Sequence, residues 1–187
     1  MRTKILVLAL AFLFLCTPVQ SQKKVEQSEE FLLRAIEFHG HLGPYLVLGL
    51  KAGLFSNQIF GREPMETKAF IKTKTTPPQS CFADGVQFST GCTLGKGNIS
   101  LIEGEGLLVT FKKNNQKLTL KLKKEIIEEI NSLPDQEEAW ENLAKDLYQR
   151  EIEEIFKVSK SESGSKHQKP ENPCLPPSVH FFPEREL

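Results

Sequence analysis

The chain has 187 residues, of which 39% are hydrophobic and 26% are charged, a composition typical of a globular protein with one sizeable core. Its 24 basic and 24 acidic residues give a formal net charge of zero. Because no basic excess is available to neutralise a phosphate backbone, the composition argues against a nucleic-acid-binding role.

The N-terminus predicts a signal peptide over residues 1–21. Two basic residues precede an apolar run over residues 5–16, which is shorter than the roughly 20 residues of a membrane-spanning helix. Small residues follow at the positions that a signal peptidase reads, so we expect cleavage before Gln22. The mature protein is then exported and has no membrane span. Lipid attachment at Cys16 is the alternative, but the leucine before it fits that pattern poorly.

Hydrophobic periodicity beyond the signal predicts a single α+β domain. We expect helices over residues 27–38, 44–55, 81–88, 123–130 and 132–156. We expect one strand in residues 67–74 and three more within residues 99–122, with EGEG and KNNQ as hairpin turns. These elements make a small, largely antiparallel sheet packed with helices. Residues 159–187 are rich in Pro, Ser and Lys, which predicts a flexible tail.

His39 and His41 stand one residue apart in "HGHLGP", just before the helix expected at Pro44. In an extended or tightly turned segment their side chains can converge on one point. Imidazole is the commonest protein metal ligand, and the free N–H groups of a helix N-terminus favour an anion. The pair therefore indicates a metal or an anionic ligand. The alternative is that one histidine caps the helix while the other is merely exposed.

Cys81 and Cys92 are candidates to complete a zinc site, because two thiolates and two imidazoles suit tetrahedral Zn²⁺. No C-x-x-C pair occurs, so such a site depends on how the fold joins the two motifs. In an oxidising compartment, a Cys81–Cys92 disulfide is the alternative. Another is that Cys81 packs in the core while Cys92 stays free. A further option, thiol redox chemistry at Cys92, predicts a low thiolate pKa aided by Lys96.

A glycine-rich loop, "TGCTLGKGN", follows the predicted helix over residues 81–88. Its spacing is not that of a P-loop, but successive backbone N–H groups in such a turn can bind an anion, and a lysine adds charge. The candidate ligand-binding residues are Asp84, Thr93, Gly95, Lys96 and Gly97, with Asp84 also able to orient a metal ligand from the outer shell. The alternative is a turn that needs glycine only for positive φ angles.

Two blocks, "AIEFHGHLGPYLVLGLKAG" and "PPQSCFADGVQFSTGCTLGKGNI", closely resemble the FmdE family of formylmethanofuran dehydrogenase. The resemblance implies a small α+β domain over residues 22–158, often dimeric and in several members zinc-bound. The resemblance identifies no catalytic residue, because catalysis by that enzyme takes place in its other subunits. The resemblance also predicts a homodimer, so a second copy of this chain is an expected partner.

This sequence departs from the family at two places. Many relatives have a cysteine where this chain has Gly43, and many append a cysteine-rich zinc ribbon, whereas this tail contains only Cys174. Export also separates this chain from a cytoplasmic enzyme. The resulting hypothesis is an exported metal-binding protein that holds zinc through His39, His41, Cys81 and Cys92, with a small anionic ligand on the GKG loop. The alternative is a non-catalytic anion- or partner-binding module with a Cys81–Cys92 disulfide.

Overall fold

A computed structural model of the chain describes residues 19–162, with side chains from residue 29 onward. The predicted signal peptide over residues 1–21 lies almost wholly outside this part, and so does the tail beyond residue 162. Among residues 19–162, no helix is both long and apolar enough to cross a membrane.

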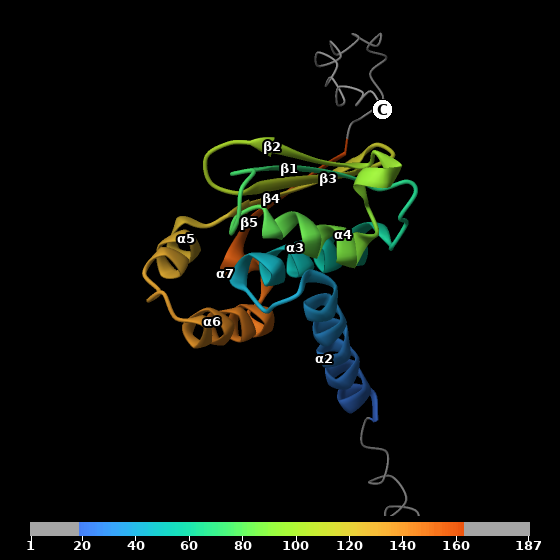
Figure 1. Ribbon diagram of the computed structural model, residues 1–187. Helices are drawn as coiled ribbons and strands as arrows, with labels where there is room; N and C mark the ends of the chain where they lie inside the picture. Colours follow the sequence, from blue (N-terminus) through green and yellow to red (C-terminus); the bar gives the residue numbers. More distant parts are fainter. Residues whose placement is uncertain (1–18, 163–187) are drawn as a thin grey trace, which may run out of the picture.

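The described residues contain a five-stranded sheet with the strand order β2-β1-β3-β4-β5 (Figure 1). The strands are β1 (Lys68–Thr73), β2 (Ile99–Glu103), β3 (Leu108–Lys113), β4 (Gln116–Leu122) and β5 (Phe156–Glu162). Only β1 and β2 pair in parallel, and the other neighbours are antiparallel. Exposed and buried residues alternate along β1, so one face joins the core while the other meets solvent. The predicted α+β fold with a largely antiparallel sheet is confirmed.

The position of β2 corrects one prediction. The EGEG segment was expected to be a hairpin turn, but β1 lies between β2 and β3, so the two strands it connects are not neighbours. Pairing between β1 and β2 is parallel, and a parallel pair needs a crossover, which α4 (Cys81–Thr90) supplies. The KNNQ turn is confirmed, since it joins β3 to β4 and Asn114 has a φ of 52°.

The helices lie below the sheet in Figure 1, with α3 (Pro44–Phe60) beside α4 and α2 (Val19–His39) projecting from the body. α3 is apolar nearly all round, and most of its residues are buried. It packs closely on α4 where Gly49 faces the backbone of Phe82 and Gly85 faces that of Leu46. This crossing fixes the position of α4, which carries part of the candidate site.

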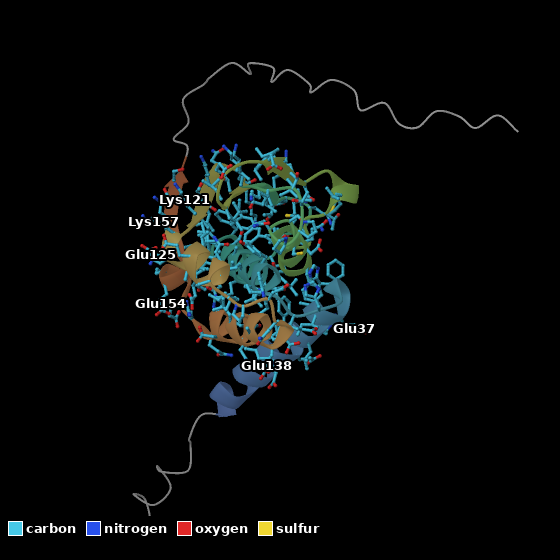
Figure 2. All side chains as sticks on the ribbon, turned by 60° about the vertical axis from the view of Figure 1, so that its left-hand side comes forward. Glu37, Lys121, Glu125, Glu138, Glu154 and Lys157 are labelled. Atoms are coloured by element: carbon cyan, nitrogen blue, oxygen red, sulfur yellow. The ribbon has the colours of Figure 1, made fainter. Side chains whose placement is uncertain are left out.

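The C-terminal region corrects a second prediction. Instead of one long helix over residues 132–156, the structure has α6 (Glu137–Gln149), α7 (Ile152–Ile155) and then β5, while α5 (Lys124–Asn131) agrees with its prediction. Extended backbone at Arg150 ends α6. Glu151 then begins α7 through a capping box with Glu154. Side chains labelled in Figure 2, among them Glu138 and Glu154, lie on the outside of this helical region.

The predicted start of the flexible tail at residue 159 is wrong. Residues 159–162 belong to β5, which pairs with β4 along its whole length, as far as Glu162 opposite Gln116. The polar composition of this segment hid the strand, because an edge strand with one solvated face needs few apolar side chains. The folded domain therefore extends to residue 162, four residues beyond the predicted boundary.

Candidate functional site

His39 and Asp84 bring the two sequence motifs into contact. His39 is the last residue of α2, and Asp84 lies in the first turn of α4. The His39 Nδ1 atom lies 2.8 Å from Asp84 Oδ2, and the side chains are 7% and 40% exposed, respectively. In the neutral tautomer that donates its Nδ1 hydrogen to this carboxylate, the lone pair of Nε2 is free. This is the arrangement that orients a histidine for a metal or for proton transfer.

His39 Nε2 is buried and has no hydrogen-bond partner among the described residues. A buried polar atom without a partner is uncommon, because no hydrogen bond offsets the free energy that its desolvation costs. The His41 ring stands next to it, with the two ring centroids 4.6 Å apart. The prediction that the two imidazoles converge is thus met in the structure, and a buried lone pair is available for a ligand beside them.

Cys81 lies on the same face of α4 as Asp84, since three residues separate them in a helix. It is half-buried, and burial raises the pKa of its thiol, with the nearby Asp84 carboxylate raising it further. Both residues line a pocket of about 350 Å³ together with His39 and Gln87. Apolar side chains, Leu94 and Ile99 among them, also line the pocket. A small pocket with apolar walls and a few convergent polar groups is the usual form of a ligand site.

Gln87 is a site residue that the sequence reasoning missed. Its Nε2 donates to Asp84 Oδ1 at 3.3 Å, and its Oε1 accepts from the backbone N–H of Leu94 at 3.4 Å. It therefore joins the carboxylate of the site to the glycine-rich loop. The signal was present in the sequence, because Cys81, Asp84 and Gln87 recur at the three-residue spacing of one helix face.

Cys92 lies apart from Cys81, at the other end of α4. It follows the C-terminal end of α4, whereas Cys81 begins that helix. Nine helical rises of about 1.5 Å each already place Thr90, two residues before Cys92, roughly 13 Å from Cys81. This is far beyond the roughly 6 Å between the Cα atoms of a disulfide. Both are free thiols in the structure. The predicted four-ligand set and the alternative disulfide are therefore both incompatible with this geometry.

The environment of Cys92 is that of a core residue. It is fully buried, and its thiol lies 3.3 Å from the carbonyl oxygen of Thr67. Burial raises the pKa of Cys92, and the smaller opposing effects of Thr90 and Lys96 do not reverse this. The thiol-redox hypothesis requires a low thiolate pKa at Cys92, so this hypothesis is wrong.

The two thiols should differ sharply in reactivity. We expect iodoacetamide to modify Cys81 roughly 100-fold faster than Cys92 in the native protein, because Cys92 becomes accessible only when the core opens. Peptide mapping by mass spectrometry after timed alkylation measures both rates. Equal rates in the native protein, with equal rates also in urea, would contradict this placement of Cys92.

The hydrogen bonds of the glycine-rich loop are largely internal. In η1 (Leu94–Lys96) and its flanks, the N–H of Thr93 donates to Asn98 Oδ1 and the N–H of Gly97 donates to the carbonyl of Leu94. The Lys96 ammonium donates to the carbonyl of Gly91 and so caps the C-terminal end of α4. These groups stabilise the turn itself, and a prediction of anion binding at Thr93, Gly95, Lys96 and Gly97 gains no support from them.

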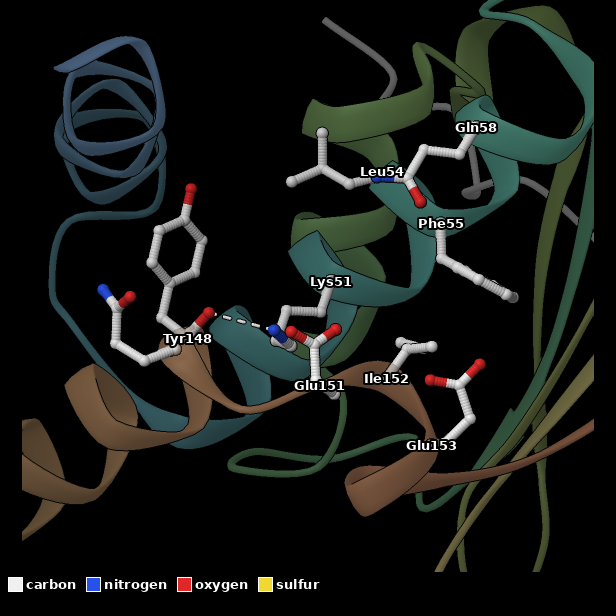
Figure 3. Close-up of a pocket in the computed structure, with 9 residues that line it drawn as sticks. Lys51, Leu54, Phe55, Gln58, Tyr148, Glu151, Ile152 and Glu153 are labelled. Carbon is white, nitrogen blue, oxygen red and sulfur yellow. Dashed lines mark hydrogen bonds between the residues drawn. The ribbon is translucent and has the colours of Figure 1, made fainter. Parts of the chain in front are cut away.

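A second cavity, of about 420 Å³, lies elsewhere, between α3 and the segment from α6 to α7 (Figure 3). Lys51 lines it and donates to the carbonyl of Tyr148 at 2.9 Å and to that of Arg150. Burial lowers the pKa of Lys51, opposed by Glu151 and Glu154. Because the ammonium group is engaged by carbonyls at the end of α6, it acts as a helix cap.

Replacing Lys51 with methionine should therefore reduce stability. We expect a loss of about 1–2 kcal/mol, because the methionine keeps the apolar contacts but removes the ammonium group that donates to the carbonyls of Tyr148 and Arg150. Urea unfolding measures the change. Lys145→Met is the matched control, because Lys145 pairs with Glu141 on an exposed face and should change stability by less than about 0.5 kcal/mol. Equal effects of the two substitutions would contradict the capping role.

The family model described as "FmdE, Molybdenum formylmethanofuran dehydrogenase operon" matches residues 38–162. The chain belongs to the FmdE family. The match begins one residue before His39 and ends with β5, so it spans the whole candidate site. The resemblance seen in the two sequence blocks is thereby confirmed.

Two of the proteins that are similar to this FmdE-family chain are informative. A curated protein of Archaeoglobus fulgidus, named "Probable S-adenosyl-L-methionine-binding protein", is 33% identical over 89 residues, which cover 46% of this chain and 24% of that protein. The chain thus aligns with about a quarter of that relative. The crystal structure of a tungsten formylmethanofuran dehydrogenase FmdE-like protein from Syntrophus aciditrophicus matches with a TM-score of 0.53 and 20% identity, over 73% of each chain. This second likeness supports the fold.

Proposed function

We propose that this FmdE-family protein is an exported metal-binding protein whose site lies at His39 and His41, with zinc as the favoured ion. The observation that carries the proposal is the buried lone pair of His39 Nε2, which has no protein partner among the described residues while Asp84 holds the opposite ring nitrogen. A metal ion at Nε2 would satisfy that atom and complete the carboxylate–histidine arrangement. The signal-like N-terminus supports export.

The described residues supply fewer pre-arranged metal ligands than a complete zinc site has. No group of three or more His, Cys, Asp or Glu side chains is already arranged to hold a metal within residues 29–162. Two imidazoles adjoin each other, and Cys81 lines the same pocket as His39. We therefore propose a site with two histidine ligands, Cys81 as a third after a change of rotamer, and an open position that faces the pocket. Such a site binds more weakly than a complete structural zinc site.

The apolar part of the pocket supports a second candidate function, the binding of a small organic ligand beside the histidines. Its volume falls within the range of small-molecule sites. The relative from Archaeoglobus fulgidus is named for S-adenosyl-L-methionine, so this compound is the first organic ligand to test. A homodimer, suggested by the family resemblance, stays a further proposal that sedimentation velocity can test.

Metal content by inductively coupled plasma mass spectrometry tests the metal proposal. The protein is purified without added metal and then equilibrated with limiting Zn²⁺. We expect near-stoichiometric zinc in the wild-type chain and at least a tenfold loss of affinity in His39→Ala and in His41→Ala. Cys92→Ala serves as the control and should retain the metal. Zinc that is retained in both histidine variants would overturn the proposal.

A further inference from the structure

The outward face of the sheet carries six exposed lysines on four strands. They are Lys68, Lys72, Lys112, Lys117, Lys121 and Lys157, here called the lysine face. The registers place Lys68, Lys112 and Lys117 in one row across β1, β3 and β4. The second row contains Lys72, Lys121 and Lys157 and ends on β5. No acidic residue occupies an outward position of the five described strands, and no arginine does. None of the six forms an ion pair with a described carboxylate.

This arrangement is unfavourable for folding. Lys112 lies directly opposite Lys68 on one side and Lys117 on the other, and Lys121 lies directly opposite Lys157. Like charges at directly opposite positions destabilise a sheet, whereas opposite charges there would stabilise it. A face that served only solvation would mix the two signs. The structure thus concentrates positive charge at a cost in stability, which indicates an anionic binding partner.

The rest of the molecule balances the lysine face. Acidic residues outnumber basic ones on α5, α6 and α7, which explains a formal net charge of zero. In Figure 2, Lys121 and Lys157 lie nearest the sheet end, Glu125 and Glu154 follow below them on the same side, and Glu138 and Glu37 lie toward the opposite end. Such a separation of charge would orient the protein with its sheet toward an anionic surface.

Apolar side chains lie among the lysines. Phe70, in the middle of β1, is 39% exposed with the Lys112 ammonium 5.1 Å from its ring centroid, and Ile102 on the edge strand is 55% exposed. We propose that the lysine face docks on an anionic phospholipid surface. The lysines would contact the headgroup phosphates, and Phe70 and Ile102 would enter the boundary between headgroups and acyl chains. A cluster of four to eight basic residues is what such surfaces attract.

The side chains favour a lipid surface over a nucleic acid. Sheets that bind single-stranded nucleic acid present several aromatic rings on which bases stack, whereas Phe70 is the only aromatic residue at an outward position of these five described strands. Peripheral docking needs no membrane-spanning helix, in agreement with the described helices.

Co-sedimentation of the full-length chain with vesicles tests this proposal. One set of vesicles is pure phosphatidylcholine, and the other is equimolar phosphatidylcholine and phosphatidylglycerol. We expect preferential binding to the second set that weakens as salt is added. Neutralising Lys68, Lys112 and Lys117 to glutamine should lower the partition coefficient by about 100-fold. The apolar N-terminal run is identical in every variant and cannot account for this difference.

The control neutralises three exposed lysines away from the face, Lys124, Lys145 and Lys160, and should bind like the wild type. If the first triple variant does not fold, neutralising the second row (Lys72, Lys121 and Lys157) to glutamine replaces it. Equal binding of wild type and row variants to phosphatidylglycerol vesicles would overturn the proposal. So would preferential, lysine-dependent binding of a single-stranded oligonucleotide, or the absence of lipid binding.

Discussion

Replacing Gly43 with cysteine is expected to raise the affinity for Zn²⁺ by about 100-fold, since even the loss of an outer-shell partner changes metal affinity 10- to 100-fold. A side chain at Gly43 would begin 3.4 Å from His41 Nε2. A thiolate there can share a tetrahedral ion with that nitrogen, because Zn–S and Zn–N bonds of about 2.3 and 2.0 Å place the two ligand atoms close together. Gly43 has extended backbone, with φ of −146°, so cysteine fits without strain.

Competition with a chromophoric zinc chelator measures this gain. Gly43→Ser is the matched control, because it adds a side chain of similar size without a thiolate and should leave the affinity nearly unchanged. A cysteine variant that binds zinc no more tightly than the serine variant would place the metal away from His41.

Replacing Gly85 with alanine is expected to cost about 3 kcal/mol or more, a large part of the stability of an average domain. Its Cβ atom would lie 2.2 Å from the carbonyl oxygen of Leu46 and 2.6 Å from the backbone nitrogen of Leu50. Both atoms belong to the backbone of α3, so no rotamer change can relieve the clash. Helix propensity alone predicts the opposite sign, because alanine in a helix is favoured over glycine by about 1 kcal/mol.

Thermal or urea unfolding distinguishes the two expectations for Gly85. Gly95→Ala is the control, because a Cβ atom there would meet nothing within 4 Å and stability should change by less than about 0.5 kcal/mol. Since α4 also carries Cys81 and Asp84, any folded Gly85→Ala protein should have weakened contact between His39 and Asp84. A Gly85→Ala protein as stable as the wild type would contradict the close crossing of α3 and α4.

Local pattern was enough to predict most elements but not their arrangement. Apolar periodicity located α3, and alternation located β1, because both signals lie within one segment. The insertion of β1 between β2 and β3 could not be read in this way, since strand order is decided by long-range packing. The same holds for β5, whose polar residues 159–162 pair with β4 through backbone groups.

The candidate site was predicted in part. The convergence of His39 and His41 followed from their spacing, and the contact between His39 and Asp84 needed the fold. The error at Cys92 was avoidable, because a helix over residues 81–88 already separates it from Cys81 by more than one metal ion can bridge. The lysine face could not be predicted from composition, because the formal net charge of the whole chain is zero. Only the sheet registers reveal that the lysines gather on one face.

The measurement that tests the metal site most directly is a long-range ¹H–¹⁵N spectrum of the histidine side chains with and without Zn²⁺. We expect the signals of His39 Nε2 and of a ring nitrogen of His41 to shift on addition of zinc, while Nδ1 of His39 stays protonated toward Asp84. His167 and His180, the other two histidines, should not change. Shifts confined to those two residues, or no shifts at all, would contradict a metal site between His39 and His41.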